Sequence, residues 1–311
     1  MLMTMPPKIL VTGSNGFLGT NFYQYMRVNH PEVECWCFDR VYRQDILNQK
    51  LVDEAIQGKT HVIHFAAETH VDNSISGPES FMTTNFIGTY NILEACKKHG
   101  AKLVFISTSE VYGSMAEGYT IQDETHPLNP QSPYAASKCA ADRLCYSYFK
   151  TYGMPVVTVR PFNQFGNYQA CEKAIPLFID KAAQGLPLPV YGDGLASRDW
   201  LFVKDTVSGV WAAAEHLAPG EVVNLATAKT YTLIELVELI KKAVGRHDIN
   251  TVHVTATADR PGHVQTLIGS YAKAEKLMGW KPKYDLEEAL KITADWYFAN
   301  GKIMPPPMWK L

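Results

Sequence analysis

Tyr134 and Lys138 have residue types and a spacing that suit acid–base chemistry. They lie four positions apart in the run YAASK, so on a helix both side chains share one face. A lysine ammonium beside a phenol stabilises the phenolate and lowers the pKa of the tyrosine, which makes it a usable base near neutrality. Alone, the pattern Y-x-x-x-K occurs by chance in many helices. Tyr134 is therefore a candidate base whose significance depends on what else the chain provides.

A glycine motif near the N-terminus predicts a dinucleotide-binding turn. Gly13, Gly16 and Gly19 follow the apolar run KILVT and open a helical pattern. The first permits a tight turn, the second lets the backbone approach a pyrophosphate, and the third allows close helix–strand packing. The N–H groups of the helix N-terminus then face the phosphates. Downstream of such a turn, and about 24 residues after the strand-ending sequence Ser-Thr-Ser-Glu, Tyr134 and Lys138 become a strong catalytic signal.

Asp39 favours NAD over NADP as the dinucleotide. It lies about 20 residues after the glycines, at the end of the second apolar run. A carboxylate there can accept from both ribose hydroxyls and repels a 2′-phosphate. Arg40 favours NADP instead, because an arginine at this place can bind the 2′-phosphate. Asp45 and Ile46 are then placed to flank the adenine.

Alternating strand-like and helical segments must position these residues. Strands are expected at residues 8–12, 35–39, 61–65, 103–107 and 156–160, and helices at 17–28, 51–57, 80–99 and 134–152. Unbroken apolar strands separated by helices indicate a parallel sheet covered on both faces. We therefore predict an α/β fold with a Rossmann-type doubly wound parallel sheet.

The alternation of strand-like and helical segments ends after Arg160, where proline and glycine residues become frequent. Helices are expected at 176–184, 232–244 and 285–300, with a strand at 221–225. The chain is expected to leave the sheet after Phe162 and to return to it near 200–226. This predicts an NAD-binding domain of residues 1–166 plus 195–226. A smaller, discontinuous α+β substrate-binding domain would comprise residues 167–194 plus 227–311.

The composition limits the classes of protein to which the chain can belong. Its 311 residues are 46% hydrophobic and 19% charged, which excludes wholesale disorder. The 29 Lys and Arg residues nearly balance 31 Asp and Glu residues, so we expect no nucleic-acid or membrane partner held by bulk charge. The sequence has no recognisable secretory signal and no apolar run of about 18 residues, so no transmembrane helix is expected.

Six scattered cysteines, with no C-x-x-C pair, predict neither a disulfide framework nor a metal site. Cys35 and Cys37 lie two apart on an expected strand and are predicted to be small buried thiols. A reducing, cytoplasmic location fits this cysteine usage best.

In combination, the motifs resemble the extended short-chain dehydrogenase/reductases of the NAD-dependent epimerase/dehydratase family, which act on nucleotide sugars. Within that group the chain looks like the dTDP-glucose 4,6-dehydratases. The resemblance covers about residues 8–300. It is carried further by AAETHVD at 66–72, TNFIGTYNILEA at 84–95, STSEVYG at 107–113, EKAIP at 172–176, RDWL at 198–201 and DRPGH at 259–263.

The resemblance implies a redox-neutral dehydration of a nucleotide-activated hexose. Tyr134 would take the proton of the sugar 4-hydroxyl while hydride leaves C4 for NAD, and Lys138 and the positive nicotinamide ring would favour the phenolate. Thr108 would donate a hydrogen bond to O4. Glu110 would abstract the C5 proton, water would leave from C6, and hydride would return to C6. The product would be a 4-keto-6-deoxy sugar, and NAD would stay tightly bound because each turnover regenerates it.

Ser109 departs from the dTDP-glucose pattern, in which an aspartate serves as the acid for the departing hydroxyl. Serine is a far weaker acid, so one outcome is that Glu110 carries both proton transfers. The run Thr-Ser-Glu also resembles GDP-mannose 4,6-dehydratases, UDP-N-acetylglucosamine 4,6-dehydratases and UDP-glucuronate decarboxylases. The alternatives are a UDP-glucuronate decarboxylase, a nucleotide-sugar 4-epimerase and, more remotely, a non-catalytic NAD-binding regulator. The decarboxylase signature before Tyr134 is missing, and 4-epimerases are not expected to have a glutamate at position 110, so elimination is the leading hypothesis.

The resemblance also assigns binding residues. Besides the glycines of the turn, Asp39, Arg40, Asp45 and Ile46, the expected cofactor contacts are Phe17, Leu18, Phe65, Ala66, Ala67, Thr84, Tyr134, Lys138 and Gln164. The expected pyrophosphate ligands are Lys173, Arg198 and Arg260, since an arginine fork or a lysine charge suits phosphate. The other expected substrate contacts are Thr69, Asn163, Ala174 and His263, with Pro189 and Tyr191 against the nucleobase.

Several positions do not determine which nucleotide sugar is the substrate. Gln164 and Thr232 differ from the residues of the dTDP-glucose pattern, so neither the nucleobase nor the C2 substituent is determined. Among the histidines, His64 is expected to be structural because it lies in a buried strand, whereas His70 has no assigned role.

Residues 80–99 and 134–152 resemble the paired helices through which members of this family form homodimers, as an intermolecular four-helix bundle. Ile87, Tyr90 and Leu93 on the first of these helices are equally compatible with core packing. The expected partners are therefore a nucleotide-diphosphate sugar and a second copy of the chain.

Overall fold

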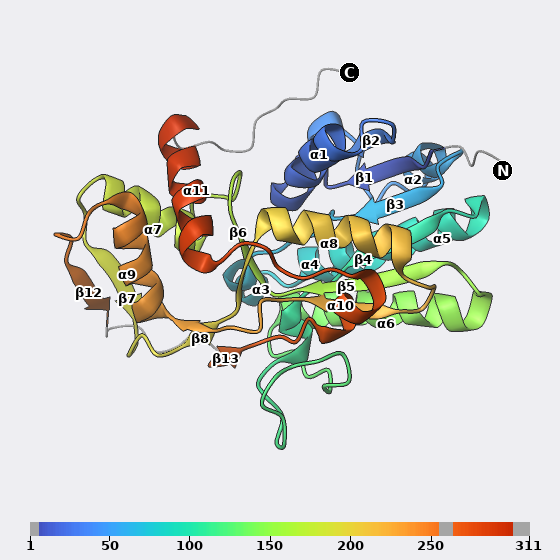
Figure 1. The fold of residues 1–311 in the computed structure, drawn as a ribbon. Coiled ribbons are helices and arrows are strands. Elements are labelled where there is room, and N and C mark those ends of the chain that lie inside the picture. Colours follow the sequence, from blue (N-terminus) through green and yellow to red (C-terminus); the bar gives the residue numbers. More distant parts are fainter. Residues whose placement is uncertain (1–5, 255–263, 301–311) are drawn as a thin grey trace.

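The computed structural model describes residues 6–254 and 264–300, and its centre is a six-stranded parallel sheet. The strands are β1 (Lys8–Thr12), β2 (Glu34–Phe38), β3 (His61–His64), β4 (Lys102–Ile106), β5 (Val156–Pro161) and β10 (Val222–Leu225). Their order is β10-β5-β4-β3-β1-β2, and every pairing is parallel (Figure 1). The predicted doubly wound parallel sheet is confirmed. The strand order reverses at β1, which places a ligand crevice at the carboxyl ends of β1 and β3.

Helices cover both faces of this sheet, because successive strand residues point to opposite sides. Ile9 and Val11 pack with α1 (Phe17–Asn29) and α8 (Val203–His216) in one core cluster. Leu10 packs with α2 (Gln49–Ile56), α5 (Thr89–His99) and α6 (Pro133–Tyr152) in another. The sequence analysis predicted three of these helices to within a few residues but missed α8.

The helix expected over residues 80–99 is confirmed, because residues 79–99 form one continuous helical stretch, but this stretch contains a π-helical turn that was not predicted. Two short helices, α3 (Val71–Ser76) and α4 (Glu79–Phe81), come before a π-helical turn over Met82–Gly88, and α5 follows. Within the π turn, the Asn85 amide bonds to the backbone of Glu68 and to the Ser137 hydroxyl. Such π segments are frequent at functional sites. Here the turn ties the expected cofactor contact Thr84 to the helix that carries Tyr134.

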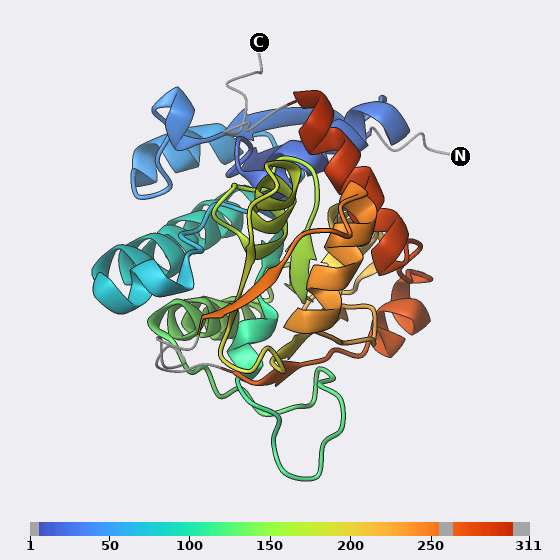
Figure 2. The same ribbon diagram turned by 90° about the vertical axis from the view of Figure 1, so that its left-hand side faces the viewer.

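The remaining elements form a smaller α+β part beside the sheet. Its helices α7 (Ala174–Ala183), α9 (Leu233–Val244) and α11 (Leu286–Asn300) pack against one another (Figure 2). Short strands join it: β7 (Leu188–Tyr191) with β12 (Thr251–Val254), and β8 (Ser197–Arg198) with β11 (Tyr231–Thr232) and β13 (Thr266–Leu267). Two further strands, β6 (Asn163–Phe165) and β9 (Trp200–Phe202), pair with each other, and α10 (Ala272–Met278) packs on α8 and β10. None of the described helices has the length and apolar character needed to cross a bilayer.

Candidate active site

A cleft of about 920 Å³ lies at the carboxyl ends of the parallel strands. Residues that follow β1, β2, β3, β4 and β5 all line it, as do residues of α7 and α9. This is the position at which open α/β sheets bind their ligands. The predicted residues in the lining are Gly13, Gly16, Phe17, Leu18, Gly19, Asp39, Arg40, Asp45, Ile46, Phe65, Ala66, Ala67, Thr69, Thr84, Thr108, Ser109, Glu110, Tyr134, Asn163, Gln164, Lys173, Ala174 and Arg198.

A few predicted residues do not line this cleft. Lys138 is buried, with 3% of its surface exposed, and acts through the groups described below. Pro189 does not line the cleft, since its β7 neighbours Leu188 and Val190 point into the core and strand alternation turns Pro189 the other way, so its contact with a nucleobase stays a prediction. The predictions for Arg260, His263 and the side chain of Tyr191 fall outside the part of the chain that the structure describes.

The glycine turn has the geometry that a dinucleotide needs. Gly13 has a φ of +65°, and its N–H donates to the carbonyl of Phe38 over 2.9 Å. A Cβ at Gly19 would lie 2.2 Å from the carbonyl oxygen of Gly13, so only glycine lets α1 pack this closely on the turn. No side chain caps the N-terminus of α1, so its first N–H groups remain for a pyrophosphate. The turn therefore fits the phosphates of NAD.

Asp39 and Arg40 resolve the choice of dinucleotide further. The Asp39 carboxylate accepts from the N–H groups of Asn15 and Val41, which holds it at the end of β2 beside the cleft. The Arg40 guanidinium donates to Glu68 over 2.7 Å, and this bond raises the pKa of Arg40. An exposed pair is worth at most about 1 kcal/mol, so it biases Arg40 away from a 2′-phosphate without locking it. Both residues favour NAD.

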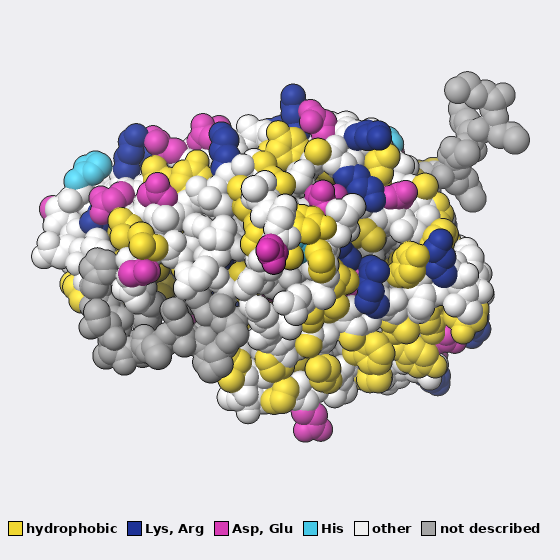
Figure 3. Space-filling view, turned by 90° about the horizontal axis from the view of Figure 1, so that it is seen from below, with side chains coloured by type: hydrophobic (Ala, Val, Ile, Leu, Met, Phe, Trp, Pro, Cys, Tyr) yellow, Lys and Arg dark blue, Asp and Glu magenta, His cyan; other side chains and the backbone are white. Residues whose placement is uncertain are grey.

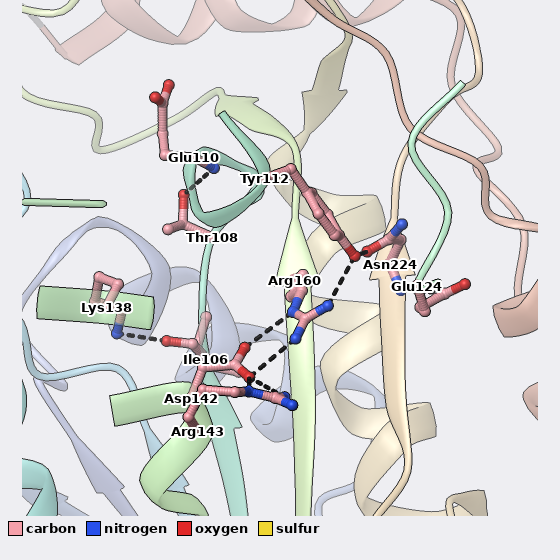
Figure 4. A network of polar contacts seen from close by, with 10 residues as sticks. All are labelled: Ile106, Thr108, Glu110, Tyr112, Glu124, Lys138, Asp142, Arg143, Arg160 and Asn224. Atoms are coloured by element: carbon pink, nitrogen blue, oxygen red, sulfur yellow. Dashed lines mark hydrogen bonds and ion pairs between the residues drawn. The ribbon is translucent and has the colours of Figure 1, made fainter. Parts of the chain in front are cut away.

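Thr108, Glu110 and Tyr134 all line the cleft, the first two just after the end of β4 and the third at the start of α6. Thr108 caps the short 3-10 turn Ser109–Tyr112, and its hydroxyl accepts from the N–H of Glu110 over 3.2 Å (Figure 4). α6 begins at Pro133 with Ser132 as its cap, which places Tyr134 in the first turn. Burial raises the pKa of Tyr134 to about 12, whereas a hydrogen bond with Thr108 lowers it. The arrangement suits a phenol that exchanges a proton with a bound hydroxyl.

Burial and the Thr108 hydrogen bond are the main influences on the pKa of Tyr134, so the expected lowering of that pKa by Lys138 stays a prediction. The Lys138 ammonium donates to the carbonyl of Ile106 over 2.6 Å and lies over the ring of Phe105. Burial lowers the pKa of Lys138 to about 8, although the charge of Asp142 opposes this. Desolvation of the phenol dominates at Tyr134, so further positive charge is needed to favour its phenolate.

The cleft also contains polar residues that the sequence analysis did not assign. They are Asn15, Gln44, His70, Asp72, Gln169, Glu172 and Trp200. Among the described residues, Asn163 Oδ1, His70 Nδ1 and Trp200 Nε1 are buried and have no hydrogen-bond partner. Such atoms in a cleft are ready to bond a ligand. The only signal for them was their position inside or next to the recognised motifs.

The other side-chain expectations have mixed outcomes. His64 is structural, as predicted: it lies between the hydroxyls of Thr12 and Thr89, and burial lowers its pKa to about 3. Cys35 and Cys37 are predicted to be buried, but the structure leaves them half-buried because β2 is the edge strand of the sheet. All six thiols are free, and no cluster of metal-ligating side chains occurs in residues 6–254 and 264–300.

Comparison with known proteins places this site in a family. The family model of GDP-mannose 4,6 dehydratase matches residues 10–293. The dTDP-glucose 4,6-dehydratase of Streptomyces antibioticus is 36% identical over 94% of this chain and 92% of its own length. The crystal structure of dTDP-glucose 4,6-dehydratase from Bacillus anthracis in complex with NAD has a TM-score of 0.84 and 36% identity, and the match covers 94% of this chain and 97% of that one.

Epimerases have the same architecture. The crystal structure of Thermus thermophilus UDP-glucose 4-epimerase in complex with NAD has a TM-score of 0.86 at 28% identity, covering 95% of this chain and all of that one. The family match spans the glycine turn, the Thr108–Glu110 segment and the helix of Tyr134. The chain therefore belongs to the GDP-mannose 4,6-dehydratase family, within the extended short-chain dehydrogenase/reductases.

Proposed function

We propose that this chain is an NAD-dependent nucleotide-sugar 4,6-dehydratase, a carbon–oxygen lyase. The observation that carries this proposal is that Thr108, Glu110 and Tyr134 line one cleft together with the dinucleotide turn. Bound NAD would accept hydride from C4 of the sugar and return it to C6 at the end of the turnover. The relatives named dTDP-glucose 4,6-dehydratase support this activity.

The chain's own residues account for the first proton transfer. The Tyr134 phenol exchanges its proton with the sugar 4-hydroxyl, and Thr108 is bonded to that phenol and orients the same oxygen. Lys138 supplies a buried positive charge one helical turn along α6. Glu110, the only acidic residue of the 109–112 turn, then removes the C5 proton that the 4-ketone acidifies. Loss of water from C6 leaves the enone that accepts the returning hydride.

The rate of C4 oxidation should fall as the pH rises above about 8. Burial disfavours the charged form of Lys138, so its ammonium loses a proton near pH 8, well below the ordinary pKa of lysine. A neutral amine no longer stabilises the Tyr134 phenolate, and kcat/KM should then decrease by about tenfold per pH unit. A profile of kcat/KM for dTDP-glucose from about pH 6 to about pH 10 measures this. A rate that keeps rising to the alkaline end contradicts the role of the Lys138 charge.

Replacing Ser109 separates the two candidate acids for the departing hydroxyl. Ser109 is 2% exposed and is a far weaker acid than Glu110, so Ser109→Ala should keep elimination within about threefold. Ser109→Asp restores the acid of the dTDP-glucose pattern and should keep or raise the rate. Both rates are measured by single-turnover formation of the 4-keto-6-deoxy product. A loss of about 100-fold in the alanine variant would instead place the serine hydroxyl in the proton transfer.

Two cationic side chains in the cleft support a nucleotide-sugar substrate. Lys173 occupies the N-cap position of α7, and the Arg198 guanidinium is held by the carbonyls of Ser197 and Gln265. Lys173 and Arg198 both line the cleft, and phosphate oxygens suit a helix N-terminus flanked by such charges. We therefore assign the pyrophosphate to this side of the cleft, between Lys173 of the proposed substrate-binding domain (residues 167–194 plus 227–311) and Arg198 of the proposed NAD-binding domain.

A panel of substrates tests the proposed function directly. The protein with its bound cofactor is incubated with dTDP-glucose, UDP-glucose, UDP-N-acetylglucosamine and GDP-mannose, and products are identified by NMR. We expect one of them to yield a 4-keto-6-deoxy sugar. If none does, the proposal is wrong. Carbon dioxide released from UDP-glucuronate would identify a decarboxylase, and inversion at C4 without loss of water would identify an epimerase.

We further propose a homodimer through α5 and α6. Exposed apolar side chains project from the π turn, α5 and α6, namely Met82, Ile87, Tyr90, Tyr146 and Tyr152. Figure 3 shows apolar side chains gathered over the part of the molecule that carries α6. Exposed patches of this kind commonly mark protein–protein contacts.

The free thiols suit a reducing compartment, so we place the activity in the cytoplasm.

Light scattering after gel filtration tests this dimer. The chain should elute at twice its monomer mass, and Ile87→Glu should convert it to the monomer because a charge cannot be buried unpaired. Val28→Glu is the matched control, since Val28 is an exposed apolar residue on α1. A monomeric wild-type chain contradicts the proposed dimer, as does an Ile87 variant that stays dimeric.

A further inference from the structure

A fully buried ion pair joins α6 to β5 behind the active site. Arg160 donates from Nε and Nη2 to the two carboxylate oxygens of Asp142, each over 2.9 Å. Asp142 is 0% exposed and Arg160 is 2% exposed. Burial opposes both charges, yet the guanidinium holds the pKa of Asp142 below its usual value. The two charged groups are therefore fixed in a bidentate geometry.

The third donor of this arginine extends the contact to the catalytic turn. Arg160 Nη1 donates to the Tyr112 hydroxyl over 3.0 Å, and that hydroxyl donates to Asn224 Oδ1 over 2.7 Å. The N–H of Asn224 donates to Glu124 in turn. Figure 4 shows these groups in one continuous line from α6 across β5 to β10. Tyr112 and Asn224 are both 0% exposed, so these side chains find their hydrogen-bond partners within the protein.

Tyr112 is the last residue of the turn that carries Glu110. The turn is fixed at its start by the bond from the Glu110 N–H to Thr108 and at its end by the Tyr112 hydroxyl. Gly113 follows with a φ of +66°, and a Cβ there would lie 2.0 Å from the carbonyl oxygen of Asn129. Glu110 and Tyr112 leave the turn on opposite sides, so Glu110 points away from the ion pair (Figure 4). The network thus holds the backbone of Glu110 without touching its carboxylate.

Stability alone gives no reason for this arrangement. Removing two charges from water offsets most of their attraction, and buried ion pairs replaced by apolar groups often lose nothing. Geometry does give a reason, because α6 carries Tyr134 and Lys138 whereas the turn carries Thr108 and Glu110. One rigid link between the two segments fixes the distance between the C4 proton acceptor and the C5 base.

We propose that Tyr112, held by the Arg160–Asp142 pair, is a positioning residue that sets Glu110 for proton abstraction from C5. The inference rests on the proposed dehydratase function. It separates the two halves of the reaction: C4 oxidation depends on Tyr134 of α6 and on Thr108 at the start of the turn, whereas C5 proton abstraction depends on Glu110, which the Tyr112 end of the turn holds in place. Displacement of a reacting group by about 1 Å costs on the order of 100-fold in rate.

Tyr112→Phe tests this inference, with Tyr148→Phe as the matched control. Tyr148 is also a buried tyrosine, and its hydroxyl donates to Glu94 on α5, away from the catalytic turn. Two steps are measured with dTDP-glucose on the protein with its bound cofactor. Absorbance at the wavelength of reduced nicotinamide follows C4 oxidation, and deuterium uptake from D₂O at C5 follows the second step.

We expect Tyr112→Phe to slow C5 exchange by about 100-fold while C4 oxidation stays within about threefold, so reduced cofactor accumulates. Tyr148→Phe should change neither step. A general loss of structure would lower both steps together, and that result overturns the inference. So does a Tyr112 variant that behaves like the control. Failure of the wild-type protein to make any 4-keto-6-deoxy product is a separate outcome, which counts against the proposed function itself.

Arg160→Lys provides a second route to the same answer. A lysine keeps a positive charge for Asp142 but has no fork that reaches Asp142 and Tyr112 at once. The same selective loss of C5 exchange is expected, with a smaller effect on C4 oxidation. If the lysine variant folds and exchanges C5 at the wild-type rate, the link through Arg160 does not position Glu110.

Discussion

Tyr134→Phe should abolish the appearance of reduced cofactor and the formation of product, with the rate of C4 oxidation reduced by about 10²- to 10⁴-fold. The substitution removes only the hydroxyl that exchanges a proton with the sugar. Tyr134 is 8% exposed and packs edge-on against Phe81, so phenylalanine keeps the shape of the site. Stopped-flow absorbance of the bound nicotinamide measures the step.

Binding must be shown to survive in this variant. Cofactor content after purification and nucleotide affinity by calorimetry should match the wild-type values, since phenylalanine keeps the ring and its packing on Phe81 and loses only the hydroxyl. A Tyr134→Phe protein that oxidises C4 within about tenfold of the wild-type rate would remove Tyr134 from the mechanism. If turnover is lost but the biological role of the protein persists, the chain is an NAD-binding regulator rather than an enzyme.

Glu110→Gln should block the reaction after C4 oxidation, one step later than Tyr134→Phe does. Glutamine has the size of glutamate but cannot accept the C5 proton, so C4 oxidation continues while C5 exchange falls by about 10²- to 10⁴-fold. Reduced cofactor and the 4-keto hexose should then accumulate together. The measurement combines nicotinamide absorbance with deuterium uptake at C5.

Glu172→Gln is a suitable control for this variant, because Glu172 is a second carboxylate of the same cleft with no proposed proton transfer. It should exchange C5 at nearly the wild-type rate. Normal turnover of the Glu110 variant would mean that the C5 base is another residue. Loss of C4 oxidation in the same variant would mean that Glu110 acts before the elimination.

The sheet and the glycine turn could be predicted because their signals are local. The apolar runs KILVT and LVFIS need no distant partner to be recognised as buried parallel strands. Gly13 and Gly19 are identified by their spacing, and the structure shows the steric reason for it. Thr108, Glu110 and Tyr134 were found for the same reason: each lies in a short motif at the end of a strand or the start of a helix.

Features that depend on distant contacts could not be predicted. The π turn over Met82–Gly88 follows from contacts with residues far away in sequence, since a Cβ at Gly88 would lie 2.4 Å from Ile46 Cδ1. The hydrogen bond from Lys138 to the carbonyl of Ile106 could not be predicted, because the spacing of Tyr134 and Lys138 on a helix does not indicate how that helix packs on β4. Strands such as β8 have two residues, too few for any periodicity.

The ion pair behind the active site is a further case. Arg160 is the fifth residue of an apolar strand, and Asp142 lies in the middle of a helix, so neither has a local signal for the other. Only the fold brings them together, 18 residues apart in sequence. Motif reasoning therefore identified the groups that meet the ligand but missed the groups that hold them in place.

Transfer of the label from dTDP-glucose deuterated at C4 tests the central claim most directly. The account predicts a 4-keto-6-deoxy product that carries this deuterium at C6, because the hydride removed from C4 returns to the same molecule. Analysis of the product by NMR or mass spectrometry locates the label. A sugar that keeps its 6-hydroxyl, with deuterium back at C4, would contradict the account and identify an epimerase.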